Sequence, residues 1–73
     1  MSHQIVWTKL VNFMGPSRAR SLMSNTLEQL GLAELRSATD RLQFANLLIA
    51  SGGANQFIGE RIALQARLHG ARG

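Results

Sequence analysis

The amino-acid sequence predicts a small all-α domain built as a bundle of four helices. Apolar residues recur at the three- and four-residue spacing of helices in four successive segments. Glycine, in one case followed by proline, interrupts this pattern between segments. With 73 residues and a mass of 8.0 kDa, the chain has room for a single domain over residues 1–73. We expect residues 1–2 and 70–73 to be frayed.

The first segment, residues 3–14, has its apolar residues at helical spacing. Residues 5–10 begin with two β-branched side chains, which also fit a short strand, so the sequence leaves both conformations open there. Gly15 and Pro16 end the segment, because glycine suits a left-handed helix cap and proline cannot continue a helix.

The second segment, residues 16–30, carries one apolar stripe typical of an amphipathic helix. Pro16 fits its first turn, where the missing N–H has no helical partner to lose. Gly31 follows as the expected cap residue, and Leu32 is placed for the hydrophobic contact of a Schellman motif.

The third helix is predicted from a cap at Ser37, with Asp40 in its first turn, to about Ala50. Its apolar residues cover more than one side, which is typical of a helix in the centre of a bundle. After a break at residues 51–53, the last helix runs over about residues 54–69. Gly59 within it lowers helix propensity, so we expect a close approach of another backbone there.

Composition limits the classes of protein to consider. The chain has no cysteine, which excludes disulfides and cysteine-based zinc sites and suits a reducing compartment. It has no apolar run approaching a membrane span, and its first residues lack the pattern of a signal peptide. The sequence therefore predicts a soluble, cytoplasmic protein.

Catalytic and metal-binding patterns are missing from the sequence. The four acidic residues do not pair at helical spacing, and His3 and His69 lie near opposite ends, where we expect them to be exposed. The glycine-rich run at residues 52–55 lacks the strand and the Lys-Ser/Thr pair of a phosphate-binding loop and predicts a helix–helix turn. We expect no enzymatic activity, no cofactor and no metal.

The net charge of +4, with arginine as seven of the eight basic residues, permits an acidic partner. The helical pair over residues 40–67 could act as a helix-turn-helix that binds nucleic acid. Its candidate contacts are Asn55, Gln56, Arg61 and Arg67.

Arg18 and Arg20 lie in the first turn of the second helix, where basic residues oppose the helix dipole. A helix N-terminus with two guanidinium groups is suited to holding an anion. These arginines are candidate contacts for a phosphate or an acidic partner, or are simply solvated.

Hydrophobic residues make up 45% of the chain, more than the thin core of so short a domain obviously needs. The surplus predicts apolar surface that meets another protein or a second copy. Either core packing or docking explains the apolar side chains of the first segment. The candidate contacts are Trp7, Leu10, Phe13 and Met14. The sequence thus predicts a non-enzymatic protein–protein interaction module, homo-oligomeric and regulatory or adaptor-like, with a nucleic-acid-binding module as the alternative.

Overall fold

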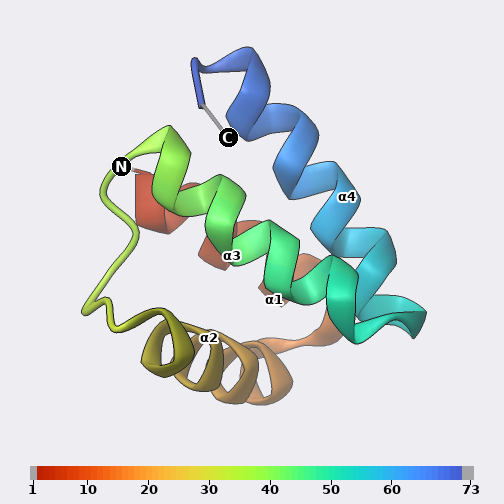
Figure 1. Cartoon of the computed structure of the whole chain (residues 1–73). Coiled ribbons are helices and arrows are strands. Elements are labelled where there is room, and N and C mark those ends of the chain that lie inside the picture. The colour runs from red at the N-terminus through yellow and green to blue at the C-terminus, as the bar shows by residue number, and fades with distance from the viewer. Residues whose placement is uncertain (1, 72–73) are drawn as a thin grey trace.

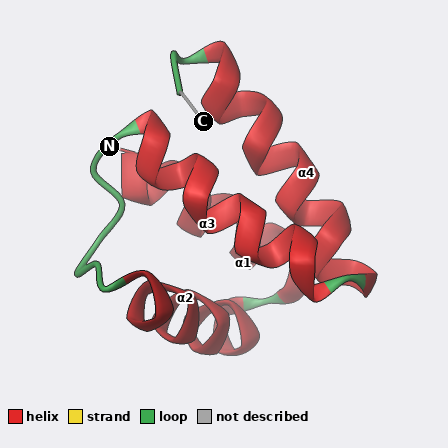
Figure 2. Cartoon of the chain, in the orientation of Figure 1, coloured by secondary structure: helices red, strands yellow, loops and turns green. Residues whose placement is uncertain are grey.

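A computed structural model describes residues 2–71, and within that range the chain forms helices and no strands (Figures 1 and 2). The all-α prediction is confirmed. The elements are α1 (Ser2–Met14), α2 (Pro16–Leu30), α3 (Ala38–Ser51) and α4 (Gly53–Leu68). Residues 5–10 lie inside α1, so the strand alternative is wrong. Helical packing prevails because Val6 and Leu10, one helical turn apart, both lie fully inside the core.

The turn between α1 and α2 consists of one residue, Gly15. Its N–H donates to the carbonyl of Val11 at 2.8 Å, and its own carbonyl accepts from the N–H of Ala19 at 3.0 Å. Gly15 therefore closes one helix and opens the next. Its φ of 87° lies in the region that side chains with a Cβ rarely adopt, which explains glycine at this position.

Two helices end in Schellman motifs. At the end of α2, Gly31 is left-handed, and the N–H of Leu32 donates to the carbonyl of Leu27 at 3.0 Å, as the sequence predicts. At the end of α4, Gly70 donates to Arg67, and Ala71 donates to the carbonyl of Ala66 at 2.9 Å.

The structure describes part of the chain ends that we expect to be frayed. Ser2 is the first residue of α1, and Ala71 packs against the core after its Schellman bond. The other terminal residues of that expectation, Met1, Arg72 and Gly73, lie outside the described residues.

The start of α3 follows the capping prediction. Ser37 Oγ accepts from the N–H of Asp40 at 3.1 Å, and Asp40 Oδ2 accepts from the N–H of Arg36 at 3.0 Å. The first bond satisfies a donor that the first turn of the helix leaves free, and the second ties the residue before the cap to the first turn.

Helices α3 and α4 form a tight hairpin joined through Gly52, and a helix precedes the glycines, as the helix–helix turn requires. The expected close approach at Gly59 is confirmed. A Cβ on this residue would lie 2.9 Å from the carbonyl oxygen of Ala45 and 2.9 Å from Leu48 Cβ. The hairpin depends on a glycine here because its backbone touches that of α3.

The core lies between all four helices. α1 and α3 each contact the other three helices, whereas α2 and α4 pack on different sides of them (Figure 1). The central position predicted for α3 is thus confirmed. Fourteen hydrophobic side chains form the buried cluster: Val6, Leu10, Ala19, Met23, Leu27, Leu35, Leu42, Phe44, Ala45, Leu48, Ile58, Ile62, Ala63 and Ala66.

Candidate partner-binding surface

Four large hydrophobic side chains remain exposed in the described part of the chain, and they belong to α1 and α4. The exposed fractions are 40% for Phe13, 57% for Phe57, 61% for Leu64 and 76% for Leu68. Single exposed leucines are ordinary on protein surfaces, whereas apolar side chains gathered on one face indicate a contact surface.

The large exposed hydrophobic residues of α4, together with Arg61, form a stripe along the helix. Phe57, Arg61, Leu64 and Leu68 are separated by four, three and four residues, which places them on one side of the helix. The opposite side of α4 packs into the core. The helix therefore has two apolar sides, one turned inward and one turned to solvent.

The end of α1 and the start of α4 are joined by an aromatic pair. The rings of Phe13 and Phe57 stack with centroids 6.1 Å apart and an angle of 26° between their planes. Such a pair contributes about 0.5–1.5 kcal/mol beyond its buried area. The stack places the two exposed rings side by side where α1 ends and α4 begins.

Three adjoining hollows of about 380, 280 and 450 Å³ lie along α1 and α4, and Lys9 lines all three. Arg61 lines the first two of them. We call this region the α1–α4 face and define it by six residues, Lys9, Phe13, Phe57, Arg61, Leu64 and Leu68. Its composition combines apolar area with two cations.

Gln65 contributes an unusual polar atom to the wall of this face. Its side chain lines two of the hollows, and its Oε1 is buried without a hydrogen-bond partner. Unpaired buried acceptors are uncommon, because each loses its hydration without compensation. One buried acceptor in the wall of the face thus has no hydrogen bond within the described chain.

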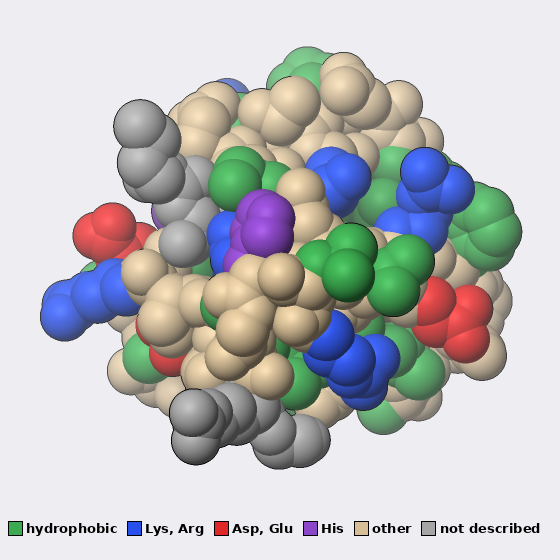
Figure 3. All heavy atoms as spheres, turned by 90° about the horizontal axis from the view of Figure 1, so that it is seen from above, with side chains coloured by type: hydrophobic (Ala, Val, Ile, Leu, Met, Phe, Trp, Pro, Cys, Tyr) green, Lys and Arg blue, Asp and Glu red, His purple; other side chains and the backbone are tan. Residues whose placement is uncertain are grey.

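Figure 3 views the molecule from the end where α4 finishes. On that face hydrophobic side chains lie beside Lys and Arg side chains, and Asp and Glu side chains lie toward the two sides of the view. Apolar and basic groups are therefore mixed on this end of the molecule.

The interface predicted from the first segment is partly misplaced. Phe13 is exposed, but Leu10 is 0% exposed and is a core residue, so its side chain is removed from the predicted contacts. Trp7 and Met14 are half-buried and pack against the core cluster. Leu64 and Leu68 were missing from the prediction, although the apolar residues around the whole of α4 were the signal for them.

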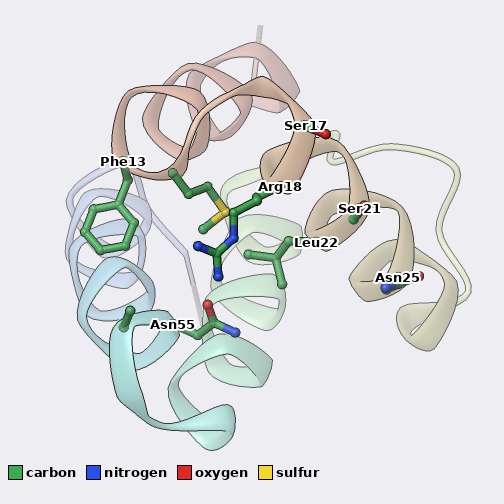
Figure 4. A pocket seen from close by; sticks show the side chains of 9 residues that line it. Phe13, Ser17, Arg18, Ser21, Leu22, Asn25 and Asn55 are labelled. Atoms are coloured by element: carbon green, nitrogen blue, oxygen red, sulfur yellow. The ribbon is translucent and has the colours of Figure 1, made fainter.

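Arg18 and Arg20 do not form one site. Arg18 lines a cavity of about 560 Å³ between the α1–α2 corner and the start of α4, where its side chain extends toward Asn55 (Figure 4). Arg20 does not line this cavity. Residues two apart on a helix point in directions about 160° apart, which explains the separation. Arg18 alone stays a candidate for an anion contact.

The residues predicted to read nucleic acid point in different directions. At about 100° per residue along α4, Asn55, Arg61 and Arg67 lie roughly 120° from one another. Gln56 is close in direction to Arg67, and Asn55 is half-buried at the cavity of Arg18. One groove of a duplex cannot contact all four side chains of a single helix in this arrangement.

Of the two histidines that we expect to be exposed, His69 is exposed and His3 is not. His3 is half-buried, and its Nδ1 accepts from the N–H of Leu35 at 3.2 Å, which ties α1 to the α2–α3 connection. His69 is exposed, and its Nδ1 lies 3.3 Å from Nη2 of Arg41. Since arginine only donates hydrogen bonds, this contact requires an unprotonated Nδ1.

Arg41 is only 4% exposed, and its Nε has no hydrogen-bond partner. Within residues 2–71, no group of three His, Asp or Glu side chains is placed to hold a metal ion.

Comparisons with protein-family models, curated proteins and solved structures gave no match. None of the described helices has the length and apolar character needed to cross a membrane.

Proposed function

We propose that this chain is a small protein–protein interaction module that docks through the α1–α4 face. The observation that carries the proposal is the gathering of four exposed apolar side chains around two cations on two neighbouring helices. Phenylalanine and arginine are enriched at protein interfaces, and a stacked aromatic pair offers a large apolar anchor. A non-enzymatic regulatory or adaptor role, in a cytoplasmic setting, completes the proposal.

Self-association and binding to a different protein are two forms of this function. A two-fold contact between copies places identical surfaces together, so a face with the cations Lys9 and Arg61 would lie against a second face with the same two cations. This repulsion favours a different protein as the partner. The homo-oligomer expected from composition stays a prediction.

The test replaces the exposed leucines. The variant Leu64→Gln/Leu68→Gln keeps helix-forming side chains and removes apolar area, while Ser24→Gln/Asn46→Gln makes two equivalent changes at exposed positions off the face. Each tagged protein is used for affinity capture from a lysate of its source after nuclease treatment. We expect the leucine variant to lose the protein partners that the wild type and the control variant retain. Equal recovery with all three proteins would contradict the proposal.

The same samples address the nucleic-acid alternative. Binding to nucleic acid weakens steeply as salt rises because bound counterions are released, whereas apolar docking persists. A nuclease-sensitive and salt-sensitive interaction that does not depend on Leu64 and Leu68 would support that alternative.

A further inference from the structure

This inference rests on the proposed docking function and concerns the chemistry of the partner. The three hollows of the α1–α4 face are lined by two cationic side chains, Lys9 and Arg61, and by no carboxylate. Glu60 lies three residues after Phe57 and four before Leu64, so it borders the stripe, but it points about 100° away from Arg61 and lines none of the hollows. The charged side chains that line the hollows are therefore cations alone, and the one nearby carboxylate lies at the edge of the face.

A second copy of the chain lacks a surface that complements this face. Glu28, Glu34 and Asp40 lie at the end of α2, in the α2–α3 connection and at the start of α3. The large exposed hydrophobic side chains of the described chain are all on α1 and α4, away from these three acids. Glu60 is the single carboxylate on those two helices, and against Lys9 and Arg61 it leaves the surroundings of the anchors net positive. Charge complementarity thus points to a different protein.

The shape of the face suits a helix. The stripe from Phe57 to Leu68 covers twelve residues, and the eleven steps between its ends give about 16 Å of helix at about 1.5 Å per residue. It runs beside α1, whose Lys9 lines each of the adjoining hollows. An amphipathic helix of about three turns places its apolar anchors along such a groove at three- and four-residue spacing.

We propose that the partner is a different protein presenting an acidic amphipathic helix. Its apolar side chains occupy the hollows beside Phe57 and Leu64, and its flanking carboxylates pair with Lys9 and Arg61. An anionic membrane is less well matched, because surface-binding helices carry many basic residues around their apolar side and this face has two.

The probes that test this proposal are three synthetic helical peptides of about 18 residues with identical leucine anchors. Their flanking positions carry glutamate, glutamine or lysine. Binding is measured by amide chemical-shift titration of the ¹⁵N-labelled protein. We expect the glutamate peptide to bind about tenfold or more tightly than the lysine peptide at low salt, with shifts confined to α1 and α4. The difference should shrink at about 0.5 M NaCl because exposed ion pairs are screened.

Charge reversal makes the test specific. In Lys9→Glu/Arg61→Glu, the preference should invert toward the lysine peptide. The control Arg20→Glu/Arg36→Glu changes the net charge equally at exposed arginines off the face and should keep the glutamate preference. Circular dichroism verifies that each variant is folded.

Several outcomes would overturn the inference. One is that the three peptides bind the protein equally well, and another is that none of them binds. A third is a preference for the glutamate peptide that survives charge reversal at Lys9 and Arg61. Binding to phosphatidylserine vesicles that the glutamate peptide does not displace would assign the face to a membrane, and a concentration-dependent dimer that excludes the peptide would assign it to a second copy. If the charge preference is absent while partner capture still requires Leu64 and Leu68, the docking function stands and only the acidic helix is rejected.

Discussion

Replacing Gly59 with alanine should destabilise the protein, although alanine is the better helix former. The added Cβ would lie 2.9 Å from the carbonyl oxygen of Ala45, 2.9 Å from Leu48 Cβ and 3.1 Å from Ile49 Cγ1. The first two are backbone or backbone-attached atoms, so they can yield only if α3 and α4 move apart. Overpacking of this kind costs about 1–3 kcal/mol. The higher helix propensity of alanine offsets about 1 kcal/mol of this cost.

The expected net effect of Gly59→Ala is a loss of about 1 kcal/mol in the free energy of unfolding. For a domain of this size this lowers the melting temperature by about 4–8 °C. Urea denaturation followed by circular dichroism measures the change, and Ser24→Ala at an exposed position of α2 serves as the control. The control should be neutral or slightly stabilising. A Gly59→Ala protein as stable as the wild type would refute the close packing of α3 on α4.

The same denaturation assay checks three further predictions. Leu10→Ala should lower the free energy of unfolding by about 2–5 kcal/mol because Leu10 is fully buried. Leu68→Ala, at an exposed position, should stay within about 0.5 kcal/mol of the wild type. Similar losses in both variants would contradict the burial pattern. Ser37→Ala should cost about 1 kcal/mol, since it removes the acceptor for the N–H of Asp40, and an unchanged midpoint would argue against the cap. Arg41→Met should leave stability unchanged or raise it by up to about 2 kcal/mol, because a buried guanidinium with an unpaired Nε is replaced by an apolar chain of similar length. A marked loss with Arg41→Met would show that its contact with the C-terminal end of α4 outweighs its desolvation.

Local chemistry made much of the fold predictable. Three features act within a few residues of the chain, so the sequence reveals them directly. They are the left-handed glycine at Gly31, the serine cap at Ser37 and the proline at the start of α2. The end of α4 at Gly70 carries the same local signal, but its position near the terminus suggested fraying instead. The conformation of residues 5–10 was undecided because it depends on packing against other helices, which sequence periodicity does not specify.

The candidate site was less predictable because it depends on which side of each helix faces the core. Leu10 and Phe13 are neighbours in the apolar pattern of α1, yet one is buried and the other exposed. Leu64 and Leu68 belong to the surface because the opposite side of α4 packs into the core, which the apolar pattern of the sequence does not specify. The separation of Arg18 from Arg20, in contrast, follows from helix geometry alone.

Lys9 offers a specific test of the proposal that the α1–α4 face binds an acidic partner, because it is the only lysine in the sequence. A zero-length carbodiimide joins an amine to a carboxylate in contact with it, and mass spectrometry of the cross-linked complex, captured from a lysate of the source, identifies the joined residues. We predict a link between Lys9 and an Asp or Glu of the partner. The Lys9→Arg variant should retain the partner and lose the link, because the guanidinium keeps the charge but does not couple. A partner that is captured without any Lys9 link, or that binds Leu64→Gln/Leu68→Gln as well as the wild type, would contradict the claim.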